Sequence, residues 1–449
     1  MTLFVTAACG ARWTDAQRAD VLARGQAGDG TPASASEPSA DTAVGPVGSG
    51  LSRAPGDLPL GAADPTTDGG AGPAAPAASA LPCEAPSDAP GVTDRTITIA
   101  TINTLSGPIP GIGSSSEVAM RGYVAHRNSM GGVCGRELKL VTVDDGADSG
   151  RFRAAIVDVA PRVLGIVGTA ANGDGGGAQL VESQQIPVVT GAQTNQFQDV
   201  SSVFDVNPPP PDLHQTIEKF RYLRAQGVRT AAVVTISNAA AVAELEVHEA
   251  QMRAAGIDII SRQLLPLTTL SFDSAARTVA NSGAQYLFFL AADSHDASMA
   301  RALRDIGYQP LFEEYLTGYG SSFAQLAGPA AEGATSWIRF LPAEDDGTNP
   351  EQANFLKWMA AIDPTIRPEV FAAQSWVSAK AFMDALERSP GPITRAGIIE
   401  QLRSMTSFDG GGFFGTIDLA NERSLGCTIG MRFERGQWRR LVPASGFLC

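Results

Sequence analysis

Glycine-rich and hydroxyl-rich loops that precede predicted helices are the parts of this chain best suited to bind a ligand. Residues 169–177 (TAANGDGGG) follow an apolar run and come directly before a predicted helix. Such a strand-to-helix turn exposes backbone N–H groups at the positive end of the helix, which is a favourable place for a ligand carboxylate. No Gly-Lys-Ser/Thr follows, so the loop is not a phosphate-binding P-loop. An ordinary turn has a similar composition and is the alternative interpretation.

A second candidate is the loop 106–113 together with the helix that begins at Ser114. The sequence from Ser114 to Glu117 (SSSE) is a capping-box pattern, so these serines could contact a ligand or could only cap the helix. The loop connects two predicted strands, 96–103 and 138–143, within one strand–helix–strand unit. In open α/β sheets, small ligands bind at the carboxyl ends of the strands, where this loop would lie.

Residues for catalysis or for a metal site are scarce. None of the four histidines belongs to a His-Glu-x-x-His motif or to a Cys/His array. His248 lies among three glutamates on a predicted amphipathic helix, which favours a solvated helix face over a metal site. Ser294, His295 and Asp296 are adjacent in the sequence and therefore do not face one another as a catalytic triad. The sequence predicts a protein without catalysis, metal or other cofactor.

The N-terminus is mostly apolar and ends in small residues before Cys9. Residues 6–9 (TAAC) resemble the lipobox of bacterial lipoprotein signals, whose cysteine is lipidated, although Thr6 replaces the usual leucine. The basic n-region is missing and the apolar core is short, so we expect the true start to lie upstream of Met1. We interpret residues 1–9 as the remnant of a lipoprotein signal, with a chance apolar terminus as the alternative.

The segment after Cys9 is dominated by Ala, Gly, Pro, Ser, Thr and Asp, with almost no aromatic or β-branched apolar residues. It cannot bury enough apolar surface to offset its chain entropy, so we expect residues 10–93 to form a disordered linker. As a flexible coil of roughly 80 residues, this linker would span on the order of 50 Å. That reach suits a lipoprotein that holds its folded part away from a membrane.

The other four cysteines, an even number, predict two disulfides in an exported chain. Three pairings are possible, and we favour Cys83–Cys134 and Cys427–Cys449. The first would attach the end of the linker to a Gly-Gly turn, and the second would tie the last residue to a terminal hairpin. Buried free thiols are the alternative.

The length and net charge of the chain limit the number of domains and the kinds of partner that we expect. A chain of 449 residues exceeds one typical domain and predicts two globular lobes or more. The net charge of −14 disfavours nucleic acid and an anionic membrane surface as partners. No run in the sequence approaches the roughly 18 apolar residues of a membrane-spanning helix.

Strand-like and helix-like runs alternate from about Asp94 onward, which predicts parallel sheets. The expected strands are 96–103, 138–143, 164–168, 187–190, 230–236, 258–266, 285–291 and 310–316. A proline-rich break at 207–211 (NPPPP) interrupts the alternation, which then begins again. We therefore expect two doubly wound lobes, followed by three helices and by short antiparallel strands at the end of the chain.

Six short motifs follow one another along the predicted folded part. They are 97–108 (ITIATINTLSGP), 130–140 (MGGVCGRELKL), 143–145 (VDD), 191–195 (GAQTN), 330–333 (AAEG) and 409–418 (DGGGFFGTID). In order and spacing they resemble the type I periplasmic solute-binding proteins of the leucine/isoleucine/valine-binding family, which serve ABC importers. The resemblance covers about Asp94 to Trp438 and implies two α/β lobes joined by three crossovers, with the ligand between them. It implies that lobe one is 94–207 plus 334–418 and that lobe two is 208–333 plus 419–449.

The resemblance also implies a set of ligand-binding residues. Relatives offer a hydroxyl to an amino-acid carboxylate at the position of Asn172 and Gly173. They offer a second threonine at the position of Thr194, next to which Gln193 is an apparent extra residue. Relatives hold the ligand ammonium with an acid in lobe two, where this chain has Tyr319. Asp293 could replace that acid or could simply cap a helix; without such a replacement the ligand is not an α-amino acid.

The sequence therefore predicts an extracytoplasmic substrate-binding lipoprotein of an ABC importer, anchored by lipid to the outer face of a bacterial cell membrane. We expect a monomer that captures a small polar solute, such as an amino acid, an amide or a small carboxylate, and then docks on a membrane permease. A ligand-sensing lipoprotein that signals to a partner protein is the alternative. An amide-hydrolysing enzyme is a weaker one, because the sequence offers no nucleophile–base pair.

Overall fold

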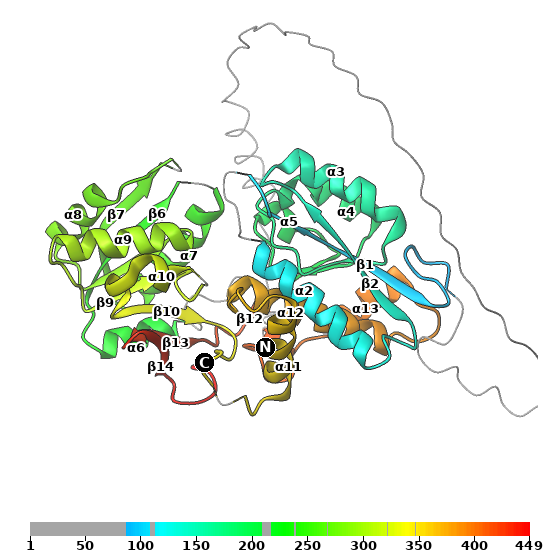
Figure 1. The fold of residues 1–449 in the computed structure, drawn as a ribbon. Coiled ribbons are helices and arrows are strands. Elements are labelled where there is room, and N and C mark those ends of the chain that lie inside the picture. Colours follow the sequence, from blue (N-terminus) through cyan, green and yellow to red (C-terminus); the bar gives the residue numbers. More distant parts are fainter. Residues whose placement is uncertain are drawn as a thin grey trace, which may run out of the picture. The chain divides into compact units, whose positions relative to one another are not determined.

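The computed structural model describes residues 87–107, 113–208, 217–237, 239–266, 268–320, 322–345 and 347–449. The expected signal remnant 1–9 and most of the expected linker 10–93 lie outside these residues, as do Cys9 and Cys83. Within the described chain, strands and helices alternate as the sequence predicts and form two main sheets (Figure 1).

The first sheet has five parallel strands in the order β2-β1-β3-β4-β5. These strands are β1 (Thr96–Asn103), β2 (Glu137–Asp144), β3 (Ile166–Val167), β4 (Val188–Thr190) and β5 (Val203–Asp205). Strand β1 shows why this sheet is buried on both faces. Ile97 and Ile99 belong to one apolar cluster, whereas Ala100 and Ile102 belong to another. Apolar residues on both faces are typical of parallel strands that are covered by helices.

Helices cover both faces of this sheet (Figure 1). One face packs against α2 (Ser114–Ser129) and α12 (Val370–Arg388), and α11 (Pro350–Ile362) contacts α2. The other face packs against α3 (Ser149–Val159) and α4 (Ala178–Gln184). Helices α5 (Asn195–Gln198) and α13 (Arg395–Leu402) complete this part of the chain. Trp376 of α12 is fully buried and is the largest side chain of the core.

The second sheet has seven strands in the order β14-β13-β10-β9-β8-β6-β7. Its parallel strands are β6 (Thr230–Ile236), β7 (Asp258–Leu265), β8 (Tyr286–Leu290), β9 (Phe312–Tyr315) and β10 (Ala334–Ile338). The antiparallel strands β13 (Ile429–Glu434) and β14 (Gln437–Val442) extend the sheet beyond β10, as expected for the end of the chain. The helices of this part are α6 (Glu218–Ala225), α7 (Ala239–Ala254), α8 (Asp273–Ser282), α9 (Asp293–Asp305) and α10 (Phe323–Ala327).

The chain passes between the two sheets three times: after β5, after β10 and before β13. The resemblance places Ala334 onward in lobe one, but β10 pairs with β9 and β13 in the seven-stranded sheet. Strand β10 is fully buried and continues the parallel order of that sheet, so the second crossover follows Ile338. A two-stranded ribbon of β11 (Ile417–Asp418) and β12 (Arg423–Ser424) lies within the third crossover. The other lobe boundaries stay predictions.

The predicted Cys427–Cys449 disulfide is confirmed and closes the end of the chain. Cys134 is also disulfide-bonded. Its predicted partner, Cys83, lies outside the described residues, so the Cys83–Cys134 pairing stays a prediction. Among the residues described, no helix is both long and apolar enough to cross a membrane.

Candidate functional site

The polar loops expected to bind ligand follow neighbouring strands of the five-stranded sheet and meet at one edge of it. The loop after β1 contacts the loop after β3, because the Thr104 N–H donates a hydrogen bond to the Ala170 carbonyl (2.9 Å). The end of β4 contacts the same loop through the Thr190 hydroxyl, which donates to the Thr169 carbonyl (2.6 Å). Parallel strands end on the same side of a sheet, so residues distant in sequence meet here.

A buried carboxylate, Asp145, uses the backbone donors of the glycine-rich loop. It is fully buried and accepts hydrogen bonds from the Thr104 hydroxyl (2.7 Å) and from the Gly173 N–H (3.0 Å). The Thr104 hydroxyl in turn accepts a hydrogen bond from the Asn172 N–H (3.1 Å). The backbone N–H groups of Asn172 and Gly173 therefore point at protein acceptors. The side-chain nitrogen of Asn172 is buried and has no hydrogen-bond partner among the described residues.

A second buried carboxylate, Asp174, uses the donors of the loop after β4. Only 1% of Asp174 is exposed, and it accepts hydrogen bonds from the Gln193 N–H (2.6 Å) and from the Thr194 hydroxyl (2.6 Å). Thr194 also caps α5, where its hydroxyl oxygen accepts a hydrogen bond from the Phe197 N–H (3.3 Å). Burial raises the pKa of Asp174 to about 6, although these hydrogen bonds act to lower it.

The structure thus brings together four of the predicted residues, Asn172, Gly173, Gln193 and Thr194. Two acids of the protein, Asp145 and Asp174, accept hydrogen bonds from the Gly173 and Gln193 N–H groups and from the Thr194 hydroxyl, so these donors are not free for a ligand carboxylate. In the sequence, Asp145 is recognisable only as part of a family motif and Asp174 only as part of the glycine-rich loop.

The start of α2 differs from the capping-box alternative. Gly113 is the N-cap residue, and no side chain caps the helix. Ser115 donates a hydrogen bond to the carboxylate of Glu369, which caps the start of α12. Ser116 is fully buried and donates to the Gly168 carbonyl (2.7 Å). Ser114 is half-buried, and its hydroxyl makes no hydrogen bond within the described residues, so it stays a candidate for ligand contact.

Tyr319 takes the place of the expected lobe-two acid, and its side chain contacts other residues of the protein. It is 2% exposed, donates a hydrogen bond to the Glu344 carboxylate (2.5 Å) and accepts one from the Ala343 N–H (2.9 Å). The Arg367 guanidinium lies over its ring, 4.6 Å from the centroid. Burial raises the pKa of the Tyr319 hydroxyl above its ordinary value. These contacts hold the second crossover against the loop between α11 and α12.

Asp293 is the first residue of α9, directly after the carboxyl end of β8. The N-cap of this helix is Ala292, so the alternative role of Asp293 as the N-cap residue is not observed. The side chain of Asp293 lies outside the described part of the structure, and its contact with a ligand stays a prediction.

Arg339 is a central residue that the sequence analysis did not identify. It directly follows β10, donates a hydrogen bond from Nη1 to the Asn207 side-chain oxygen (2.8 Å), and donates from Nη2 to the Ser424 hydroxyl. These three residues belong to the three crossovers, so Arg339 ties all of them together. Burial lowers the pKa of Arg339 to about 10, and the negative charges of Asp205 and Glu244 oppose this change. The one signal in the sequence was a lone charge within the apolar run 334–342 (ATSWIRFLP).

Asp205, at the end of β5, is almost completely buried beside this tie. Its carboxylate accepts hydrogen bonds from the N–H groups of Ala192 (3.2 Å) and Asn207 (2.7 Å) and from the Gln198 side chain (2.9 Å). Burial raises the pKa of Asp205 to about 7, and its hydrogen bonds and the nearby Arg339 act to lower it. The end of β5 is thereby connected to both the loop after β4 and the first crossover.

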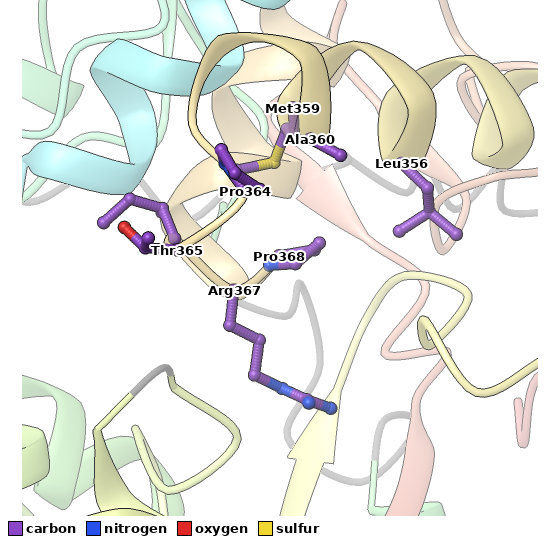
Figure 2. Close-up of a pocket in the computed structure, with 8 residues that line it drawn as sticks. Leu356, Met359, Ala360, Pro364, Thr365, Arg367 and Pro368 are labelled. Carbon is purple, nitrogen blue, oxygen red and sulfur yellow. The ribbon is translucent and has the colours of Figure 1, made fainter.

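A hollow of about 370 Å³ lies beside the loop between α11 and α12 (Figure 2). Its lining residues are Leu356, Met359, Ala360, Pro364, Thr365, Ile366, Arg367 and Pro368. None of the predicted ligand-binding residues lines this hollow, so we do not assign it as the ligand site. Among the described residues, no group of three or more His, Cys, Asp or Glu side chains is placed to hold a metal ion.

Residues 96–433, more than half of the chain, match the family described as periplasmic binding protein. The chain therefore belongs to the periplasmic binding protein family, whose members are solute-binding proteins of extracytoplasmic location. This confirms the resemblance and the fold class that the sequence motifs predict. No curated protein sequence matches the chain.

Solved structures of low sequence identity share the fold. A fatty acid ABC transporter substrate-binding protein from Thermomonospora curvata is 18% identical, with 81% of this chain and 94% of that chain covered and a TM-score of 0.69. The leucine-binding protein LivK from Thermotoga maritima is 19% identical, with 77% and 97% covered and a TM-score of 0.64. LivJ from Streptococcus pneumoniae, solved in complex with isoleucine, is 15% identical, with 78% and 100% covered and a TM-score of 0.64. At these identities the similarity establishes the fold and leaves the solute open.

Proposed function

We propose that this protein is the extracytoplasmic substrate-binding component of an ABC importer and captures a small solute between its two lobes. The observation that carries the proposal is the family match over residues 96–433. The names of the similar structures support it, since they describe a fatty acid ABC transporter substrate-binding protein, a leucine-binding protein and a branched-chain amino acid transporter substrate-binding protein.

The crossovers support a binding mechanism based on domain closure. Hinges are short segments that absorb changes in backbone angles between rigid lobes. Here Arg339 links the three crossovers through Asn207 and Ser424. A solute that enters the open form would contact the strand-end loops of lobe one, and closure would bring lobe-two groups onto it. The closed form would then dock on a membrane permease.

The lipid anchor and the oligomeric state belong to the same proposal. Cys9 would carry the lipid, residues 10–93 would act as the tether, and the folded part would work as a monomer. Two disulfides would suit the extracytoplasmic location, and one of them, Cys427–Cys449, is present in the structure.

A thermal-shift screen of the purified chain against amino acids, amides and small carboxylates tests solute binding. A ligand present at 100 times its Kd should stabilise the protein by about 2.7 kcal/mol. Uptake of the identified solute by cells that lack this protein then separates import from sensing. Loss of uptake is the expected result. Normal uptake combined with a lost cellular response to the solute would contradict the importer and favour the ligand-sensing lipoprotein.

A further inference from the structure

The guanidinium of Arg339 has only uncharged hydrogen-bond partners among the described residues. Its two hydrogen-bond acceptors, the Asn207 amide oxygen and the Ser424 hydroxyl, carry no charge. No carboxylate of the described residues lies within 4.0 Å of its nitrogens. Its Nε is buried and donates to no atom in the described part of the chain. A buried donor without an acceptor is costly, so this arrangement is suited to a group that is absent from the protein itself.

Three other half-buried arginines have a carboxylate partner, whereas Arg395 and Arg432 have none among the described residues. Arg304 is paired with Glu313, Arg367 with Glu344 and Arg440 with Asp345. In each pair a carboxylate of the protein compensates the guanidinium charge. Arg339 differs from these three arginines, because Asp205 and Glu244 act on it only from beyond salt-bridge distance. A guanidinium has five N–H donors, of which the protein uses two here.

Arg339 also lies at a position where a side chain can bind a ligand. Asp205 ends β5 of the first sheet, and Glu244 lies on α7, the helix that follows β6 of the second sheet. Arg339 directly follows β10 of the seven-stranded sheet and donates to Asn207, two residues after β5 of the five-stranded sheet, so its guanidinium lies near the carboxyl ends of strands from both sheets. Those edges are where open α/β sheets bind small ligands. The Phe414 ring, 5.9 Å from the guanidinium, provides an aromatic contact in the third crossover.

The strand-end loops of lobe one are less suited than Arg339 to bind a ligand carboxylate. Asp145 accepts the Gly173 N–H, and Asp174 accepts both the Gln193 N–H and the Thr194 hydroxyl. A ligand carboxylate placed at these donors would meet two carboxylates of the protein. The lobe-two position where relatives hold an ammonium is Tyr319, whose hydroxyl is bonded to Glu344.

We propose that Arg339 binds the carboxylate of the ligand through Nε and a free Nη N–H, and that the solute is an organic monocarboxylate without an α-ammonium group. This inference rests on the proposed solute-binding function. A guanidinium presents two parallel N–H donors that match the two oxygens of a carboxylate. The strand-end loops then contact the rest of the solute, with the unpartnered Asn172 side-chain nitrogen available to a neutral oxygen.

Calorimetric titration with matched probes tests this assignment. The probes are straight-chain carboxylates from acetate to decanoate, their primary amides, 4-methylpentanoate, 4-methylpentanamide and leucine. The wild-type chain should bind at least one carboxylate on the order of 10- to 100-fold more tightly than its amide, because a charge-assisted pair is lost in the amide. Arg339→Gln should weaken carboxylate binding by a similar factor and leave amide binding unchanged. Arg339→Lys should give an intermediate loss, since it keeps the charge and loses the fork.

The ratio of carboxylate to amide affinity separates ligand binding by Arg339 from a merely structural role. If the role were structural, Arg339→Gln would weaken the binding of carboxylate and amide equally. The exposed Arg221→Gln variant is the control and should keep the wild-type ratio, and the melting temperature of each variant reports whether it folds. Equal affinity for carboxylate and amide overturns the assignment, as does leucine binding that Arg339→Gln leaves unchanged. Binding of neutral solutes alone would leave the proposed function standing without the Arg339 site. Binding of no probe at all, in this panel or in the broader solute screen, would overturn both.

Discussion

Replacing Asp174 by asparagine should remove a pH-dependent loss of stability that the wild-type fold carries. Burial raises the pKa of Asp174 to about 6 in the folded state, from an ordinary value of 3.8. Between these two values the folded protein holds a proton that the unfolded chain has released. The free energy of unfolding therefore falls as the pH rises through this window, and the loss is complete above the folded pKa.

The size of the effect follows from the difference between the two pKa values. A change of one pKa unit corresponds to about 1.36 kcal/mol, so Asp174 should cost the wild type roughly 3 kcal/mol between about pH 4 and pH 8. Asp174 is only 1% exposed, so solvent does not screen this cost appreciably. Asparagine has nearly the shape of the protonated acid and does not titrate. The variant should match the wild type in acid and become relatively more stable by up to about 3 kcal/mol at mildly alkaline pH.

Urea unfolding, followed by tryptophan fluorescence at a series of pH values and constant ionic strength, measures this difference. Asp158→Asn is the control, because the Asp158 side chain is 63% exposed, and its curve should run parallel to that of the wild type. Asp205, whose burial raises its pKa to about 7, loses stability in the same direction and remains in both proteins. A constant difference between Asp174→Asn and wild type across the whole range would refute the reasoning, as would a wild-type stability that rises through the window.

Three further predictions concern stability. Lys219→Met should destabilise the fold by about 3–5 kcal/mol in urea unfolding, because it leaves Glu314 buried without its 2.8 Å ion pair; a double variant with Glu314→Gln should recover part of this loss, and no recovery would contradict the explanation. Trp376→Ala should cost about 3–5 kcal/mol, since the side chain is fully buried in the core, whereas Trp376→Phe should cost less; equal costs would argue against a packing origin. Replacement of Cys427 and Cys449 by alanine should lower the unfolding free energy by about 3 kcal/mol, because the bridge closes a loop over a sequence separation of 22; a melting temperature unaffected by reductant in the wild type would contradict this.

The local pattern of the chain was enough to predict the class of the fold. The alternation of apolar runs and amphipathic segments predicts parallel sheets, because each element depends on local periodicity that a single chain displays. Strand β1 and helix α2 formed close to where the pattern placed them. The order and spacing of six motifs predicted the family, and the match over residues 96–433 confirmed it. Sheet membership was less accessible: the run 334–338 is recognisable as a strand, yet only its pairing with β9 and β13 placed it in the seven-stranded sheet.

For the site, the sequence predicted which loops meet, since the carboxyl ends of neighbouring parallel strands share one edge. It did not predict where their donors point. Gly173 donates to Asp145, 28 residues away, and Thr194 donates to Asp174, 20 residues away. Arg339 bonds to Asn207 across 132 residues and to Ser424 across 85. Side-chain pairing of this kind depends on tertiary distance and on burial, which no local pattern encodes. The tertiary structure therefore decided which polar groups are already satisfied and which remain available to a ligand.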